Sequence, residues 1–293
     1  MILVTGGSGQ LARALEAFSG GRKLRRVGRP EFDFDRPETV THTLQSTRPS
    51  LVINAAAWTA VDAAESNAEA AARANHDGPA LIAHYCASAG IPLIHISTDY
   101  VFDGSKGAPY LETDAPNPIG VYGATKRAGE EAVLAGCPQA LIVRTSWVFA
   151  DSGKNFVLTM LNARRNTDRL RVVGDQRGCP TAAPALAAAL LTAADRLSEG
   201  WSHGYAGLYH ACGAGETTWH GLATALFEEA ERHGVPRPQI DAIATADWPT
   251  PVRRPADSRL ECGKLARVFG VRLPDWRDSL ADVVDRVFVR QLH

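Results

Sequence analysis

Short apolar runs alternate with longer alanine-rich helical stretches along the first half of this chain, and this rhythm constrains the fold more than any other feature. The runs are short and apolar, which is typical of strands that are buried on both faces of a parallel sheet. We therefore expect an α/β fold of the Rossmann type, a doubly wound parallel sheet with helices on both faces. The expected strands are 2–4, 24–27, 51–54, 93–97 and 141–145, and the expected helices are 63–75, 79–89, 122–135 and 184–197.

The rhythm becomes irregular beyond Trp147, which indicates a second, smaller unit. A chain of 293 residues is long for one core, and its hydrophobic fraction of 45% supports full burial. We predict a dinucleotide-binding domain formed by residues 1–148 and about 179–199. A smaller, interleaved C-terminal substrate domain would comprise about 149–178 and 200–293.

Charge and cysteine usage narrow the class of protein. The formal net charge is -1 with mixed signs, so we expect no nucleic-acid partner and no membrane partner. The first residues already form a strand without an export or membrane-spanning segment, which predicts a cytoplasmic protein. The 5 cysteines lack the paired spacing of a zinc or redox motif and the histidines lack ligand spacing. We expect reduced, mostly structural cysteines and no tightly held catalytic metal.

A glycine turn follows the first strand and opens a helix, with Gly6, Gly9 and Ala12 at three-residue intervals. The first glycine permits a tight turn, the second lets the backbone approach a pyrophosphate, and a small third residue lets the helix pack on the strand. The free amides of the helix N-terminus then favour an anion. An ordinary glycine-rich turn is the alternative, but the strand–turn–helix context favours a dinucleotide site.

Arg29 lies about twenty residues past this turn, where an NAD enzyme usually carries an acid for the ribose hydroxyl. A guanidinium there can pair with a 2′-phosphate, which favours NADPH, although Glu31 and Asp33 nearby leave NADH open. A solvated loop arginine is the competing interpretation. Asp33 and Phe34 are expected to flank the adenine, and residues 57–59 follow a strand end on the cofactor side.

Tyr122 and Lys126 are four residues apart, so on a helix their side chains share a face. An ammonium beside a phenol stabilises the phenolate, so we expect Lys126 to lower the pKa of Tyr122 and make it a general acid near neutral pH. Lys126 would also hold the nicotinamide ribose. Thr98, or less favourably Ser97, ends a strand and can bind a substrate carbonyl oxygen beside Tyr122. The alternative is an ordinary surface pair on an amphipathic helix.

With these motifs in order, the chain resembles the extended short-chain dehydrogenases/reductases and, more narrowly, the dTDP-4-dehydrorhamnose reductases. The narrower resemblance is carried by residues 54–62, 97–102, 144–149, 153–156, 175–181 and 254–260. It implies reduction of the 4-keto group of dTDP-4-dehydro-β-L-rhamnose to dTDP-L-rhamnose, a nucleotide sugar used for polysaccharides.

The resemblance also implies roles for individual residues. It assigns catalysis to Tyr122 and Lys126, and contacts with the substrate sugar and carbonyl to Thr98 and Asp99. Trp147 would line the sugar pocket, and Asn155 is expected to bind the substrate. It assigns cofactor contacts to Gly9, Gln10, Leu11, Asp33, Phe34, Ala57, Trp58 and Thr59. Arg254 and Arg259 would clamp the nucleotide diphosphate, with surface salt bridges as the alternative role. Members of the family are described with a magnesium-assisted homodimer, but no residue set in this sequence establishes Mg²⁺ binding or a dimer.

Three other functions share this fold. A 4,6-dehydratase usually needs an Asp-Glu pair after the strand-end threonine, whereas Thr98 is followed by Asp99 and Tyr100. The catalytic motif alone is also compatible with a 4-epimerase, although the motifs of the predicted substrate domain favour a reductase. A non-catalytic regulatory subunit commonly loses part of the Tyr-Lys pair, which this chain keeps.

Overall fold

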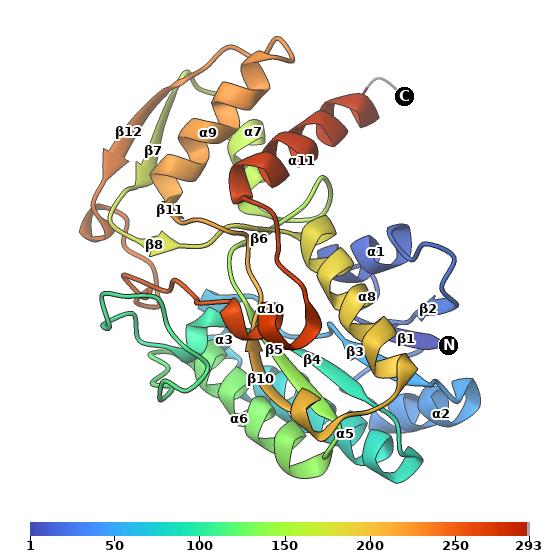
Figure 1. Cartoon of the computed structure of the whole chain (residues 1–293). Coiled ribbons are helices and arrows are strands. Elements are labelled where there is room, and N and C mark those ends of the chain that lie inside the picture. Colours follow the sequence, from blue (N-terminus) through green and yellow to red (C-terminus); the bar gives the residue numbers. More distant parts are fainter. Residues whose placement is uncertain (292–293) are drawn as a thin grey trace.

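A parallel sheet of six strands forms the centre of the computed structural model, which describes residues 1–291. The strand order is β10-β5-β4-β3-β1-β2, and every neighbouring pair is parallel (Figure 1). The strands are β1 (Ile2–Thr5), β2 (Leu24–Arg26), β3 (Leu51–Asn54), β4 (Leu93–Thr98), β5 (Ala140–Thr145) and β10 (Gly207–His210). This arrangement confirms the predicted Rossmann-type sheet.

Helices cover both faces of this sheet. Two separate hydrophobic clusters, one with α1 and α8 and the other with α2, α5 and α6, lie on its two faces. The bounds are α1 (Gln10–Ala17), α2 (Pro37–Thr47), α5 (Gly78–Ala89), α6 (Val121–Gly136), α8 (Ala183–Glu199) and α10 (Gly263–Phe269). The predicted helix 63–75 is instead divided into α3 (Val61–Ser66), α4 (Ala68–Ala72) and the π-helical turn η1 (Arg73–Asp77), because Asn67 adopts a non-helical φ of -135°.

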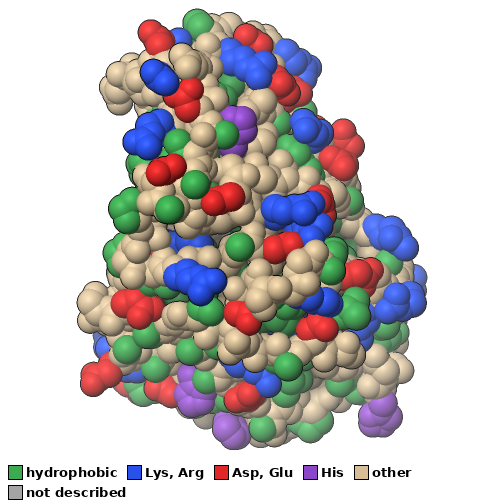
Figure 2. All heavy atoms as spheres, turned by 90° about the vertical axis from the view of Figure 1, so that its left-hand side faces the viewer, with side chains coloured by type: hydrophobic (Ala, Val, Ile, Leu, Met, Phe, Trp, Pro, Cys, Tyr) green, Lys and Arg blue, Asp and Glu red, His purple; other side chains and the backbone are tan. Residues whose placement is uncertain are grey.

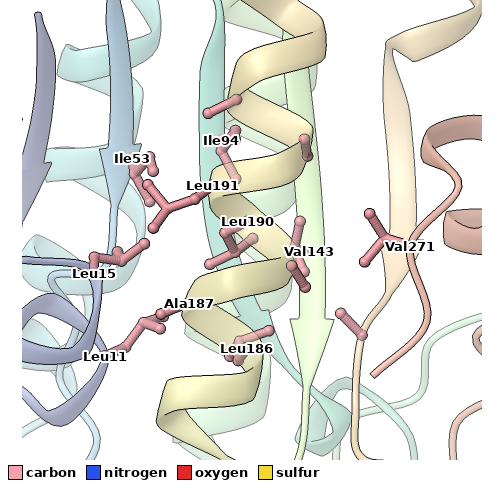
Figure 3. Packing of buried hydrophobic residues seen from close by; sticks show 14 of the residues in the cluster. Leu11, Leu15, Ile53, Ile94, Val143, Leu186, Ala187, Leu190, Leu191 and Val271 are labelled. Atoms are coloured by element: carbon pink, nitrogen blue, oxygen red, sulfur yellow. The ribbon is translucent and has the colours of Figure 1, made fainter. Parts of the chain in front are cut away.

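The packing of α8 illustrates how alternating strand residues build the core. Leu186, Leu190 and Leu191 of α8 are buried, and they belong to the same cluster as Ile53, Ile94 and Val143 of three neighbouring strands. Figure 3 shows these side chains converging between α8 and the sheet, with Leu11 and Leu15 of α1 beside them. Each fully buried leucine contributes roughly 1.5–3 kcal/mol, so this layer holds α8 against the sheet.

A smaller unit lies above the sheet in the view of Figure 1. Its core gathers side chains from α7 (Phe156–Arg164), β7 (Arg169–Val173), α9 (Trp219–Glu231) and α11 (Trp276–Gln291). β7 pairs in parallel with β12 (Gln239–Ile243), and β8 (Arg177–Gly178) pairs antiparallel with β11 (Thr217–Thr218). Between the two units, β6 (Val148–Phe149) pairs with β9 (Thr181–Ala182). The short 3-10 turns are η2 (Asp99–Val101), η3 (His203–Tyr205) and η4 (Thr245–Asp247).

Two sequence expectations differ from this fold. β10 joins the central sheet beside β5, although its residues fall in the range 200–293 that we assigned to the substrate domain. Its sequence, Gly-Leu-Tyr-His, lacks a continuous apolar run, so the rhythm did not reveal it. β2 is an edge strand with partly exposed residues rather than a strand buried on both faces, because it has a neighbour on one side only.

The surface agrees with the mixed charge of the sequence. Figure 2 shows basic and acidic side chains interspersed on the face to the left in Figure 1. Within residues 1–291, none of the helices has the length and apolar character needed to cross a membrane. All five cysteines are free thiols, and four of them are buried. The described part of the chain contains no group of three or more His, Cys, Asp or Glu side chains placed to hold a metal ion.

Candidate active site

The glycine turn between β1 and α1 has the shape of an anion cradle. Gly6 has a φ of +98°, and a Cβ there would lie 2.8 Å from the carbonyl carbon and oxygen of Ala55. Gly7 has a φ of +39° and packs against Gly28, whose Cα would be 3.0 Å from an added Cβ. The first turn of α1 has no side-chain cap, so its amides face the turn. These observations fit the pyrophosphate of a dinucleotide.

Gln10 and Leu11 follow the turn, but they point in different directions. Leu11 is buried in the core between α1 and α8, so a cofactor can contact only its backbone (Figure 3). Gln10 accepts a hydrogen bond from the side-chain amide of Asn155 at 2.9 Å. Asn155 also caps α7 by accepting from the amide of Leu158 at 3.0 Å. Asn155 therefore joins the smaller unit to the glycine turn, and a contact with the sugar stays a prediction.

Arg29, the residue predicted to bind a 2′-phosphate, lies in the loop after β2 and is 66% exposed at its side chain. Its guanidinium contacts Asp33 at 2.9 Å and Asp35 at 2.7 Å. The carboxylates hold the guanidinium in place, and they also compete with a phosphate for it. Arg26, which the sequence analysis missed, donates to the carbonyl oxygen of Gly7 in the turn itself and pairs with Glu16 at 2.9 Å.

The predicted adenine-flanking residues are partly buried. The backbone amide of Asp33 donates to the hydroxyl of Thr39 at 3.0 Å. Phe34 packs edge-on to Phe32, with ring centroids 5.7 Å apart, and lies directly against Gly78. A Cβ at Gly78 would fall 2.3 Å from the Phe34 ring, so the glycine at the start of α5 makes room for the aromatic side chain.

The loop 57–59 after β3 is held by Asn75, a fully buried residue of the turn η1. The side-chain oxygen of Asn75 accepts from the amide of Trp58 at 2.8 Å, and its nitrogen donates to the carbonyl of Trp58 at 3.2 Å. The same nitrogen donates to the hydroxyl of Thr125 at 3.1 Å. Because Thr125 precedes Lys126, Asn75 couples the predicted cofactor loop to the helix that carries the predicted catalytic pair.

Thr98 and Asp99 stand at the carboxyl end of β4, where parallel sheets place their ligands. The Thr98 hydroxyl donates to the carboxylate of Asp99 at 3.0 Å and accepts from the amide of Tyr100 at 3.2 Å, which caps η2. Burial raises the pKa of Asp99 to about 6, although the hydroxyls of Ser258 and Thr98 oppose this shift. Asp99 is thus a buried carboxyl group that titrates near neutral pH.

Tyr122 and Lys126 both lie on the buried face of α6, not on an exposed surface. The helix can approach η2 so closely because Gly123 has no side chain: a Cβ there would lie 2.2 Å from the carbonyl oxygen of Tyr100. The ring of Tyr122 packs edge-on to that of Tyr100 at 5.5 Å. The Lys126 ammonium donates to the carbonyl oxygen of Ile96 on β4 at 2.6 Å. The structure therefore brings Thr98, Tyr122 and Lys126 to one end of β4, as predicted.

The protonation energetics of this pair differ from our expectation. Burial raises the pKa of Tyr122 above its ordinary value of 10.0, and the facing hydroxyl of Thr98 opposes the shift. Burial also lowers the pKa of Lys126 to about 8, against the influence of Glu130. The predicted lowering of the Tyr122 pKa is wrong for this structure, because desolvation of the buried phenolate is the largest influence on that pKa and raises it.

Trp147, the predicted sugar-binding indole, lies just after β5 with a φ of 47°, an uncommon conformation for a residue with a side chain. Its ring stacks on that of Trp219 at 3.6 Å with an interplanar angle of 6°. Gly178 also approaches the ring, since a Cβ there would lie 2.4 Å from the indole. Trp147 is therefore held rigidly between the two units, and Trp219 is an aromatic partner that the sequence analysis missed.

The two predicted phosphate-clamping arginines have different environments. Arg254 pairs with Asp62 of α3 at 2.6 Å and lies 5.9 Å from the ring of Tyr100 on η2. Arg259 is buried and pairs with Asp257 at 2.6 Å and with Glu216 at 2.5 Å. Both arginines are thus paired with carboxylates, and their role as a phosphate clamp stays a prediction. Arg254 lies close to the candidate active site, beside Tyr100.

Comparison with known proteins decides the family. The family model described as "RmlD substrate binding domain" matches residues 1–289. A dTDP-4-dehydrorhamnose reductase of Sinorhizobium fredii is 42% identical over 284 residues, which cover 97% of this chain and 96% of the relative. This chain belongs to the dTDP-4-dehydrorhamnose reductase family. The family predicted from the motifs is confirmed.

Solved structures of the same family share the fold. The dTDP-4-dehydrorhamnose reductase of Clostridium acetobutylicum superimposes with a TM-score of 0.88 at 35% identity, covering 97% of this chain and 98% of the other. The Bacillus anthracis enzyme, described in complex with NADP, superimposes with a TM-score of 0.86 at 30% identity, covering 99% of this chain and 98% of the other.

Several residues that shape the site in this family member escaped the sequence analysis. Asn75 and Trp219 carry no recognisable motif. Gly123 and Gly129 did offer a signal, because glycine is unfavourable inside a helix and often marks a close approach. A Cβ at Gly129 would fall only 1.9 Å from the carbonyl oxygen of Asn75. The two glycines thus let α6 pack directly against both η2 and η1.

Proposed function

We propose that this protein is an NAD(P)H-dependent reductase that transfers a hydride to C4 of dTDP-4-dehydro-β-L-rhamnose and releases dTDP-L-rhamnose. The observation that carries the proposal is the convergence of Thr98, Tyr122 and Lys126 at the end of β4. The shared name of the relatives supports a reductase over an epimerase or a regulatory subunit. The oxidoreductase assignment follows from this family membership.

Tyr122 would donate the proton that the reduction needs. A bound reduced nicotinamide supplies the hydride for C4, and the carbonyl oxygen then needs a proton as its π bond breaks. Burial keeps the Tyr122 phenol protonated well above neutral pH, so it is available to donate that proton. The O–H bond of Tyr122 breaks as the sugar hydroxyl forms, which leaves a phenolate. The ammonium of Lys126, one helical turn away, stabilises that phenolate.

The other polar groups at the end of β4 orient the sugar. The Thr98 hydroxyl faces the phenol, and by turning its proton from Asp99 to the same carbonyl oxygen it would position the reacting group. Asp99 is buried beside Thr98 and would bind a sugar hydroxyl. Trp147 would cover the apolar face of the hexose, and Arg254 would pair with the diphosphate.

The cofactor would bind to the dinucleotide-binding unit that the sequence predicts. Gly6, Gly9 and the amides at the start of α1 would hold the pyrophosphate, and the loop 57–59 would lie beside the nicotinamide half. We infer that NADPH is preferred to NADH because Arg26 and Arg29 surround the end of β2. The NADP complex of the Bacillus anthracis relative supports this preference. Residues 1–148 and 179–199, together with β10, would form the cofactor-binding unit.

The test follows the absorbance of reduced nicotinamide with purified protein and dTDP-4-dehydrorhamnose, generated in place by the preceding epimerase. We expect oxidation that requires the sugar and yields dTDP-L-rhamnose. Tyr122→Phe should lower kcat by about 10²–10⁴-fold, the usual contribution of a general acid. Tyr205→Phe is the matched control, because Tyr205 packs against Phe269 in the hydrophobic cluster on the opposite face of the sheet from α6. This variant should keep normal turnover. No oxidation by a folded wild-type protein would refute the function, and an active Tyr122→Phe would refute the proton donor.

A further inference from the structure

Three polar side chains follow one another along the buried face of α6. Tyr122, Lys126 and Glu130 are spaced by four residues and are only 9%, 2% and 0% exposed. An amphipathic helix normally buries apolar residues at such positions. The catalytic pair accounts for Tyr122 and Lys126, but the proposed reaction gives no role to Glu130.

Glu130 is bound to the sheet by a strong, specific contact. Its two carboxylate oxygens accept from Nε and Nη2 of Arg144 on β5 at 2.7 Å and 2.6 Å. Both side chains are completely buried. Arg127 reaches the same carboxylate from the helix edge at 3.3 Å. Lys126 is anchored separately, to the carbonyl oxygen of Ile96 on β4. Two polar anchors, one turn apart, therefore set the position of α6 on the sheet.

Stability alone does not explain this pair. A buried ion pair pays a large desolvation penalty, and apolar residues of similar volume often replace one without loss of stability. The location of Glu130, one turn beyond Lys126 on the same face, points instead to a role at the candidate active site. We propose that Glu130, held by Arg144, is a positioning residue that places the Lys126 ammonium and keeps it charged.

The charges around Lys126 support this inference. On β4, His95 is buried, and its pKa is lowered by burial and by the ammonium, so it faces Lys126 as a neutral imidazole. On β5, Arg144 is bound to Glu130. On η2, the negative charge of Asp99 raises the pKa of Tyr122. Glu130 is the carboxylate that raises the pKa of Lys126 against burial.

The remaining elements packed on α6 place their charged groups near its ends or offer neutral ones. Glu65 of α3 accepts from the amide of Val121 at the start of the helix. His84 of α5 approaches Gly136 at its end. On η1, the neutral side chain of Asn75 contacts Thr125. Removing the charge of Glu130 therefore leaves burial to act on Lys126 with little opposition.

The inference rests on the proposed function for its effect on turnover, but the ionisation of Lys126 can be measured without substrate. The test compares Glu130→Gln with Glu131→Gln, a matched control on the same helix whose side chain is 61% exposed and pairs with Arg127. The lysine side-chain signals are titrated by NMR in ¹³C-labelled protein, and a Lys126→Met variant assigns the signal of Lys126. We expect Lys126 to titrate near pH 8 in the wild type, and about one pH unit lower in Glu130→Gln. Glu131→Gln should match the wild type.

Turnover supplies the second readout. The kcat of the wild type should fall as the pH rises through the pKa of Lys126, and Glu130→Gln should show this fall at a pH about one unit lower. If Glu130→Gln does not fold, Glu130→Gln/Arg144→Met removes both charges of the pair. This variant should show a smaller downward shift, because the lost positive charge of Arg144 partly offsets the lost carboxylate. An unchanged Lys126 titration in a folded variant overturns the inference, whatever the activity. A shifted titration in a protein that does not reduce the sugar supports the inference and refutes the proposed function.

Discussion

Replacing Gly129 by alanine tests whether close packing of α6 is required for catalysis. The glycine lies three residues after Lys126, on the side of the helix that meets η1. A Cβ at this position would lie 1.9 Å from the backbone oxygen of Asn75, whereas real Cβ atoms essentially never approach closer than 3.0 Å. The backbones of α6 and η1 must therefore separate by about 1.1 Å, the difference between these two distances.

This separation predicts the size of two effects. Overpacking of a well-packed site typically costs about 1–3 kcal/mol, and the helix propensity of alanine recovers at most about 1 kcal/mol of this. A displacement of about 1 Å at a catalytic group lowers turnover by about 10²-fold. The same movement pulls on Asn75, which brackets the loop at Trp58. We therefore expect Gly129→Ala to fold, to be destabilised by about 1–2 kcal/mol, and to lose about 10²-fold in kcat.

The measurements are urea unfolding monitored by circular dichroism and the nicotinamide assay on the same preparation. Gly136→Ala is the control, because it lies on the same helix and its Cβ would meet Ala83 at 3.3 Å, a contact that a small adjustment relieves. This control should keep both stability and turnover. If Gly129→Ala is as stable and as active as Gly136→Ala, α6 does not need its close approach to η1, and the argument for Gly129 fails.

Two further predictions concern cofactor choice and pH. Arg29→Ala should lower the preference for NADPH over NADH by roughly 10-fold or more, because a charge-assisted hydrogen bond contributes about 1.5–3 kcal/mol. The control is Arg36→Ala, which removes an exposed arginine of the same loop. If Arg29→Ala leaves the ratio of the kcat/KM values for the two cofactors unchanged, Arg29 is not part of the cofactor site. Asp99→Asn should stabilise the protein at neutral pH, since burial raises the pKa of Asp99 from 3.8 to about 6 and the folded state must then ionise a carboxyl group that prefers to stay protonated. The stabilisation should be about 3 kcal/mol at pH 7 and should vanish as the pH falls through 6 to about 4. Urea unfolding of the wild type and Asp99→Asn at pH 7 and at about pH 4 measures this difference in unfolding free energy. A difference that does not depend on pH would contradict the burial argument.

Local sequence signals were sufficient to predict the elements that depend on residues close together in the chain. The turn at Gly6 and Gly9 requires glycine for backbone reasons, and the strands around it are short apolar runs, so both could be predicted. The spacing of Tyr122 and Lys126 placed them on one helix face. β10 could not be found in this way, because Gly207, Tyr209 and His210 do not form an apolar run and the strand is defined only by its pairing with β5.

Contacts between segments far apart in the chain determined the features that the sequence did not predict. Whether Arg259 is a free cation depends on Asp257 and Glu216, and whether α6 touches η1 depends on Asn75 meeting Gly129. The pKa of Tyr122 moved in the direction opposite to our prediction, since spacing revealed the neighbouring ammonium but not the burial of the phenol. The sequence by itself determined the family, and it predicted the nucleotide-binding turn and the catalytic pair, because each depends on residues close together in the chain. Only the tertiary structure decided how those groups are charged and held, because desolvation and packing arise where segments far apart in the chain meet.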